Sequence, residues 1–168
     1  MAAINPTVRA VALSNYLAEC TAKAWAFDWQ HNNCCHFAAR WVQRMSGRDV
    51  MAGLPETPGP LAARRLVRDL GGSLAHAWTR QLGTHAIAPL TAHIGDLVLV
   101  KIAGQPAMQC RQQDGDVVHS MGICNGSNVA VLEQGGQVVF LPLCFATAAW
   151  RLPDPVEAEE AAQQGSAA

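Results

Sequence analysis

A change in the spacing of apolar residues halfway along the chain restricts its fold more than any other feature. Up to residue 83, apolar side chains recur at helical intervals, as they do on one face of an amphipathic helix. After Ile94 they stand in short, valine-rich runs separated by Gly, Asn and Asp. A helical half followed by a β-rich half predicts an α+β fold, with N-terminal helices packed on a C-terminal antiparallel sheet.

Start and stop signals divide the first half into helices. Asn5-Pro6 opens the first helix, Gly47 is the expected C-cap of the second, and Ser73 caps the fourth. The expected helices span residues 6–23, 34–45, 61–70 and 74–83.

Turn residues divide the second half into strands. The runs alternate with Gly, Asn and Asp in the way that an antiparallel meander requires. The expected strands span residues 95–101, 117–124, 129–133 and 138–143, completed by 150–152.

The composition suits a single domain. Half of the 168 residues are hydrophobic, which is enough to build a core without disulfides or metal. We assign residues 1–152 to one α+β domain. Residues 153–168 are rich in Pro, Glu, Gln and Ala, so we expect a disordered acidic tail.

Charge and hydropathy argue against two classes of partner. Twelve Lys and Arg balance thirteen Asp and Glu, and no segment concentrates basic residues, so we expect no nucleic-acid partner. The chain shows no signal-peptide pattern and no apolar stretch of the roughly 20 residues that span a bilayer. We therefore expect a protein made in the cytosol, without membrane insertion, whose six cysteines are mostly reduced.

The sharpest local feature is the segment Asn33-Cys34-Cys35-His36-Phe37 at the start of the second helix. A cysteine there feels the positive end of the helix dipole, which stabilises a thiolate. The other interpretation is that Cys34 or Cys35 packs as a small apolar residue. A nucleophilic thiolate also needs a base, and His119 is the histidine within the predicted sheet, although a strand histidine can simply bond locally.

Metal binding is a third interpretation of the same segment. His31 and His36 flank the cysteine pair, but no CxxC or HxxxH spacing accompanies them. A metal or iron–sulfur protein would have to recruit Cys34 and Cys35 together with remote thiols such as Cys110 or Cys144.

The order of several motifs resembles a known family. The motifs are Phe27-Asp-Trp29, Asn33-Cys34-Cys-His-Phe37, Gly95-Asp96-Leu-Val and Met121-Gly-Ile-Cys124, with residues 138–143 and 149–152 as closing strands. Together they resemble the NlpC-type, papain-like cysteine peptidases, and more closely their divergent relatives in phage tail gene clusters. The resemblance implies a papain-like fold and hydrolysis of cell-wall peptide bonds without a cofactor.

Residue by residue, the resemblance is incomplete. Matching on Phe37 puts Cys34 at the family's nucleophile, with Asn33 in place of the usual Asp. The family's histidine stands two residues before the Gly of the next strand, where this chain has Ser120, so His119 is one position away. Because alternate strand residues face opposite sides, we expect His119 to point away from Cys34 unless a β-bulge intervenes.

A third polar residue that orients the base has no strong match, and Glu133 or Gln134 are weak candidates. If the protein is active, Cys34 attacks an amide carbonyl and His119 shuttles the proton. Backbone N–H groups at the start of the Cys34 helix would then hold the oxyanion.

The resemblance implies a phage or prophage tail-tip or tail-assembly protein in which catalysis is either retained or lost. Its partners would be other tail-tip proteins and peptidoglycan peptides. It would reside in the host cytoplasm during assembly and then in the virion tail. The alternative, from another class, is a purely structural or adaptor protein of the tail.

Overall fold

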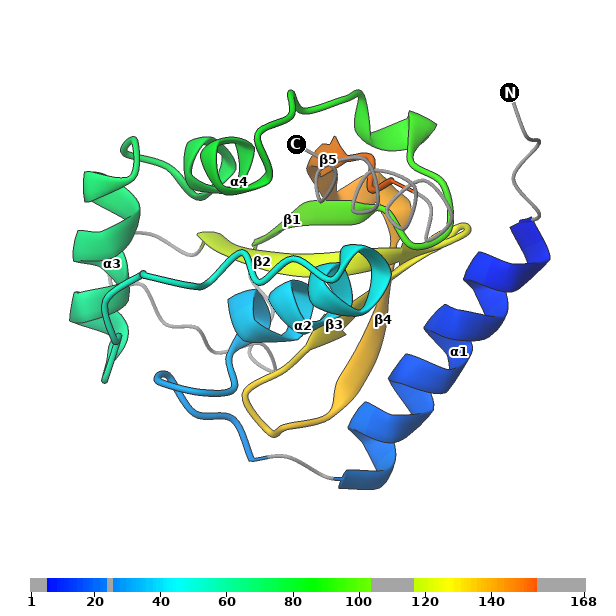
Figure 1. Cartoon of the computed structure of the whole chain (residues 1–168), viewed down its shortest axis with the longest axis horizontal. Helices are drawn as coiled ribbons and strands as arrows, with labels where there is room; N and C mark the ends of the chain where they lie inside the picture. The colour runs from blue at the N-terminus through cyan, green and yellow to red at the C-terminus, as the bar shows by residue number, and fades with distance from the viewer. Residues whose placement is uncertain (1–5, 24–25, 104–116, 154–168) are drawn as a thin grey trace, which may run out of the picture.

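The computed structural model describes residues 6–23, 26–103 and 117–153. Within these ranges, four α-helices precede five strands (Figure 1). Gly47 and Gly83 end the second and fourth helices with left-handed φ angles of 69°, and the Ser73 hydroxyl accepts a hydrogen bond from the His76 N–H. The helices are α1 (Pro6–Lys23), α2 (Cys34–Ser46), α3 (Pro60–Asp69) and α4 (Leu74–Leu82). The four predicted helices are confirmed to within one residue at each end, as are the Gly47, Ser73 and Gly83 caps, while Asn5 lies outside the described residues.

The strands form one antiparallel sheet in the order β4-β3-β2-β1-β5. They are β1 (Leu97–Ala103), β2 (Val117–Asn125), β3 (Asn128–Leu132), β4 (Val138–Pro142) and β5 (Ala146–Trp150). Short 3-10 turns, η1 (Pro89–Thr91) and η2 (Leu143–Phe145), precede β1 and β5. The α+β class is therefore confirmed.

The position of the last strand was predicted wrongly. β5 ends, rather than begins, at Trp150, and it pairs with β1 on the edge opposite β2 instead of extending the meander. Packing explains the difference, because the Trp150 ring is fully buried and its Nε1–H donates to the Thr79 hydroxyl on α4 at 3.1 Å. This contact anchors the strand at its C-terminal end.

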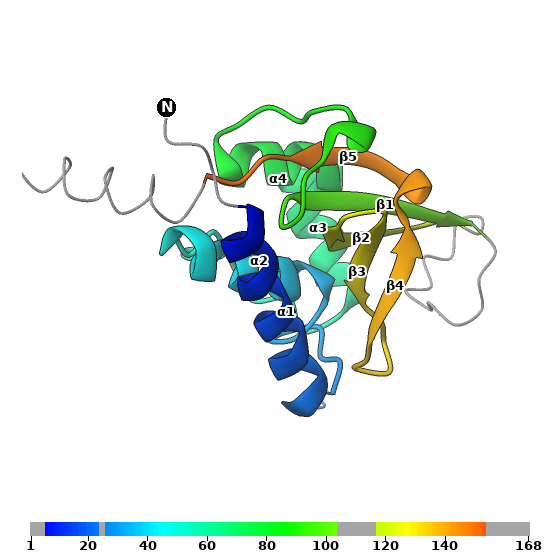
Figure 2. The ribbon, with the colours of Figure 1, turned by 90° about the vertical axis from the view of Figure 1, so that its right-hand side faces the viewer.

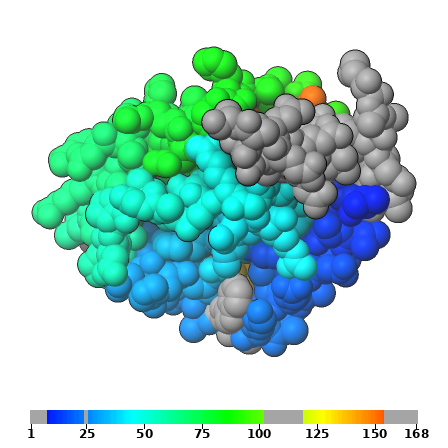
Figure 3. Space-filling view, in the orientation of Figure 1, coloured from blue at the N-terminus to red at the C-terminus, as the bar shows by residue number. Residues whose placement is uncertain are grey.

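One face of the sheet carries the main core. α1 and α2 lie on the same side of the sheet (Figure 2), and from that side helices and loops almost hide the strands (Figure 3). Leu97, Leu99, Met121 and Ile123 point toward α2 and join its buried side chains, which include Phe37 and Trp41.

The opposite face is also buried. Its six core residues are Val98, Val100, Cys124, Val129, Val131 and Ala149. Partly buried residues near η1 and η2, such as Ala92 and Leu143, pack against them. Burial on both faces explains why these strands read as nearly continuous apolar runs rather than alternating ones.

The Gly95-Asp96 motif connects the layers. The Trp41 Nε1–H of α2 donates to the Gly95 carbonyl at 2.8 Å. The fully buried Asp96 carboxylate accepts hydrogen bonds from the Arg9 guanidinium of α1 at 3.1 Å and from the Leu152 N–H at 3.2 Å. A buried carboxylate requires such partners, so this motif has a structural explanation.

Among the described residues, no helix is long and apolar enough to cross a membrane. The described cysteines, Cys20, Cys34, Cys35, Cys124 and Cys144, form no disulfide with one another. Cys110 and residues 154–168 of the predicted tail lie outside the described residues.

Candidate functional site

Asn33 fixes the start of α2. Its side-chain oxygen accepts hydrogen bonds from the Cys35 N–H at 2.8 Å and the His36 N–H at 3.1 Å, as an N-cap does. Its amide Nδ2 donates to the Trp29 carbonyl at 2.8 Å, which holds the preceding loop against the helix. Asn33 therefore serves as the structural cap of the Cys34 helix.

These bonds limit the oxyanion donors at the helix start. The N–H groups of Cys35 and His36 are engaged by Asn33, and the Phe37 N–H donates to the Asn33 carbonyl at 2.9 Å. Cys34's own N–H is the remaining donor of the first turn. The expected set of oxyanion donors thus narrows to the backbone N–H of Cys34.

Cys34 lies beside the edge of β2, next to the point where β3 ends. The Cys124 N–H donates to the Asp96 carbonyl at 2.8 Å, on the β1 side of the strand. Backbone groups alternate in direction along an antiparallel strand, so the Met121 N–H points to the opposite edge, toward β3. The β2–β3 ladder ends at the pair Gly122 and Val131, and the Cys34 sulfur accepts the Met121 N–H instead.

This environment lowers the pKa of the Cys34 thiol from 9.0 to about 6. The largest cause is a hydrogen bond from the Cys35 side chain, and the Met121 N–H and the Ser120 hydroxyl add to it. Burial opposes the shift, because it penalises a charged sulfur. Several donors directed at one sulfur thus favour the thiolate at neutral pH.

His119 lines the same cleft as Cys34, contrary to the sequence-based expectation. β1 and β2 pair in unbroken register, with His119 opposite Lys101 and Met121 opposite Leu99. His119 therefore lies on the face of Leu99 and Met121, which is the face that α2 covers. The cleft that contains both Cys34 and His119 has a volume of about 670 Å³.

The prediction that His119 turns away from Cys34 was wrong for a geometric reason. It assumed that Ser120, at the position of the family's histidine, faces the α2 side of the sheet, where alternation would turn His119 the other way. The register puts His119 on that side instead, with Leu99 and Met121, and β1 and β2 pair without a β-bulge. The Ser120 hydroxyl is nevertheless hydrogen bonded to Cys34.

The pKa of His119 is lowered from 6.5. Partial burial is the main cause, and the charge of Lys101 on the neighbouring strand adds to it. The imidazole is thus neutral at neutral pH and can accept a proton. Among the described residues, none forms a hydrogen bond with the His119 ring.

The structure does not bring the weak third candidates to this cleft. Glu133 follows β3, and its N–H donates to the Gln137 carbonyl at 2.9 Å in the turn that leads to β4. Neither Glu133 nor Gln134 belongs to the residues that line the cleft.

Sequence analysis missed the contribution of α3. Arg64 and Arg68 of this helix line the cleft opposite Cys34, together with the aromatic residues Phe27 and Trp29. The spacing of four residues between the arginines puts them on one face of a helix, and this was the available signal. Nothing local in the sequence places that face toward Cys34.

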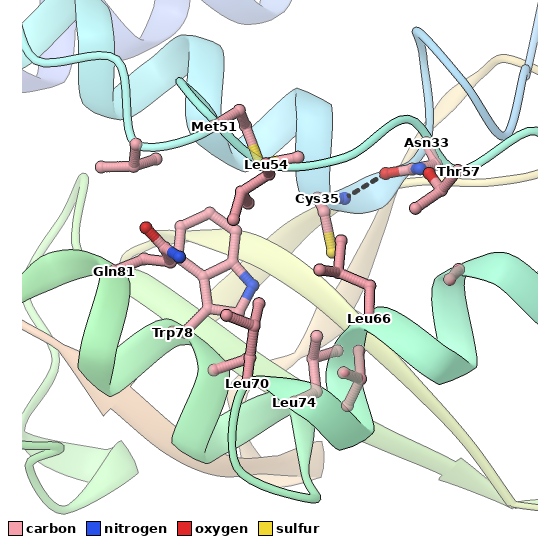
Figure 4. Close-up of a pocket in the computed structure, with 14 residues that line it drawn as sticks. Asn33, Cys35, Met51, Leu54, Thr57, Leu66, Leu70, Leu74, Trp78 and Gln81 are labelled. Carbon is pink, nitrogen blue, oxygen red and sulfur yellow. Dashed lines mark hydrogen bonds between the residues drawn. The ribbon is translucent and has the colours of Figure 1, made fainter.

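A smaller apolar cavity of about 70 Å³ adjoins the cleft. Figure 4 shows the Cys35 side chain extending from the start of α2 toward Leu66 of α3. Leu74 and Trp78 of α4 line the same cavity. The walls that the cavity shares with the cleft are Asn33, Cys35, Ala63, Val67 and Leu74. Cys35 thus lines both the apolar cavity and the cleft, and its side chain is also the main donor to the Cys34 sulfur.

The described residues contain no group of three or more His, Cys, Asp or Glu that could hold a metal ion. His31 is exposed and lies 3.4 Å from the Asp28 carboxylate, rather than beside the cysteine pair.

Fold and site together define an α+β protein with a five-stranded antiparallel sheet and a low-pKa cysteine at a helix start. Residues 8–152 match the model of a family described as a domain of unknown function, DUF6950, and the chain belongs to that family. No curated protein and no solved structure matches the chain.

Proposed function

We propose that this protein is a cysteine hydrolase of the NlpC type that cleaves amide bonds of cell-wall peptides as part of a phage or prophage tail. The observation that carries the proposal is that Cys34 and His119 line one cleft. The lowered pKa of Cys34 supports the role of nucleophile, and the neutral His119 supports the role of base. The tail assignment rests on the motif resemblance alone.

The reaction follows from these roles. His119 takes the proton of the Cys34 thiol, and the sulfur attacks the amide carbonyl carbon while the Cys34 N–H stabilises the oxyanion. The C–N bond then breaks as His119 gives this proton to the leaving amine. Water then attacks the thioester, His119 takes its proton, and the carboxylate product leaves with the free thiol restored.

The protonation states of Cys34 and His119 determine the pH at which activity should be highest. Acylation requires that Cys34 and His119 together hold one proton, because the leaving amine must be protonated. The pKa of Cys34 is about 6 and that of His119 lies below its usual 6.5, so this form is most abundant on the acidic side of neutrality. We expect a bell-shaped activity profile with its maximum on the acidic side of neutrality, and a maximum above pH 8 contradicts the assignment.

A structural tail protein without catalysis is the second candidate, and Ser120 favours it. Ser120 stands where the resemblance expects the histidine, and its hydroxyl is hydrogen bonded to Cys34. His119 is exposed on its strand and no third residue orients it among the described side chains. In this case Cys34 is a packing residue at a helix start.

Release of peptide fragments from purified cell wall distinguishes the two candidates. The hydrolase proposal expects release by the wild-type protein and its loss in Cys34→Ala and His119→Ala. Gln134→Ala is the matched control, because Gln134 does not line the cleft. Equal release by Cys34→Ala, or none by the folded wild-type protein, refutes the hydrolase and leaves the structural candidate.

A further inference from the structure

The walls of the Cys34 cleft carry charge of one sign. Among the described residues that line it, Arg64 and Arg68 are the permanent charges and none is acidic. A cleft with low-dielectric walls and one sign of charge concentrates ions of the opposite sign. The expected ligand is therefore anionic.

Both guanidinium groups retain N–H groups that can donate hydrogen bonds to a ligand. Arg64 makes no hydrogen bond or ion pair within the described part of the chain. The Nε of Arg68 lies 3.4 Å from the Asp69 carboxylate, and both side chains are mostly exposed. Such exposed pairs contribute little, so the terminal nitrogens of Arg68 remain available.

α3 presents a different chemistry on each side. Arg64 and Arg68 face the cleft, Leu66 faces the adjoining apolar cavity, and Ala63 and Val67 lie between the two. No residue of α3 is fully buried, so its attachment to the core does not account for the two arginines. Their spacing of four residues puts both charges on the side of α3 that lines the cleft.

We propose that the cleft binds substrates that carry a carboxylate, which Arg64 and Arg68 hold while the scissile carbonyl lies at Cys34. The inference rests on the proposed function in one respect, that Cys34 is the reacting residue. Arginine suits this task because its planar fork donates two parallel hydrogen bonds to a carboxylate. The substrate class is thus an acidic peptide rather than a neutral or basic one.

Two alkylating reagents of different charge test the proposal without a known substrate. Iodoacetate and iodoacetamide react alike, since the Cys34 sulfur bonds to the methylene carbon and iodide leaves. They differ in carrying a carboxylate or a neutral amide. The ratio of their rates at Cys34, read by fragment-ion mass spectrometry to separate Cys34 from Cys35, cancels the effect of thiolate content and isolates the charge effect.

We expect the ratio of iodoacetate to iodoacetamide rates to be higher at Cys34 than at the exposed Cys144. Arg64→Gln and Arg68→Gln should each lower the Cys34 ratio about threefold, and the double variant about tenfold. Arg65→Gln is the matched control, because it removes the same charge from α3 outside the cleft lining. Added salt should weaken the preference in the wild-type protein.

An unchanged ratio in the folded double variant overturns the proposal. An equal fall in Arg65→Gln also overturns it, because the effect is then only net charge. Failure of both reagents to label Cys34 overturns it as well, since a substrate then has no path to the thiol. The ratio needs no base, so loss of peptidase activity with an intact arginine effect refutes the proposed function and not this inference.

Discussion

Removing the hydrogen-bond donors around Cys34 should raise the pH at which this thiol becomes reactive. The two donors that can be deleted by substitution are the Cys35 side chain and the Ser120 hydroxyl. Cys35→Ala should have the larger effect, because the Cys35 hydrogen bond contributes most to the lowered pKa.

The size of the effect follows from the strength of such bonds. A hydrogen bond to a charged group contributes about 1.5–3 kcal/mol, and one pKa unit corresponds to about 1.4 kcal/mol. Starting from a pKa of about 6, deletion of the Cys35 thiol should therefore raise the pKa by about one to two units. Ser120→Ala should move it in the same direction by less.

The pH dependence of labelling is more informative than the rate at one pH. At pH 7 a thiol with a pKa of about 6 is about 90% thiolate, against about 1% for a pKa of 9.0. Nucleophilicity falls with pKa at a Brønsted slope of about 0.4–0.5, which costs about 20-fold over this range. At pH 7 the two effects oppose each other and leave a rate difference of only about fivefold. The midpoint of the pH profile therefore distinguishes the two cases better than the rate does.

Iodoacetamide labelling from pH 4.5 to 9.5, quantified for each cysteine by mass spectrometry, measures that midpoint. In the wild-type protein, Cys34 labelling should fall as the pH drops through about 6 and should be constant above about pH 7. Cys20 and Cys124 should label only at high pH, because burial raises the pKa of each thiol. A Cys34 midpoint above pH 8, unmoved by Cys35→Ala, refutes this account of the site.

Three further predictions concern the surroundings of the site. Lys101→Gln should raise the pKa of His119 toward 6.5, because it removes a neighbouring positive charge, and an unchanged NMR titration of His119 contradicts this. Asp96→Ala should lower the free energy of unfolding by about 3–5 kcal/mol, since it removes the fully buried carboxylate that accepts hydrogen bonds from Arg9 and from the His93 and Leu152 N–H groups; a loss below about 1 kcal/mol in urea unfolding is inconsistent with that role. Gly122→Ala should cost about 1–3 kcal/mol, because the added carbon would lie 2.6 Å from Val129 Cγ1 and 2.7 Å from the Ala130 carbonyl oxygen, and an unchanged thermal midpoint excludes the contact.

Local signals in the sequence determined the helices and most strands. Asn33, Ser73, Gly47 and Gly83 act through hydrogen bonds or backbone angles within a few residues, so their effect can be read without the rest of the fold. The place of Cys34 at a helix start is a local property of the same kind.

The last strand needed the tertiary structure. Residues 146–149, Ala-Thr-Ala-Ala, have little β-propensity of their own. They become a strand because the free edge of β1 and the buried Trp150 hold them there. The position predicted for this strand from the sequence is therefore wrong by several residues.

The chemistry of the site is also a tertiary property. The pKa of Cys34 depends first on its sequence neighbour Cys35, but also on the end of β3, which leaves the Met121 N–H to the sulfur, and on the approach of Ser120. The positions of His119 and of Arg64 depend likewise on how α2, α3 and β2 pack around one cleft. Each residue type can be read from the sequence, but distances between segments far apart along the chain are set only when the helices pack on the sheet.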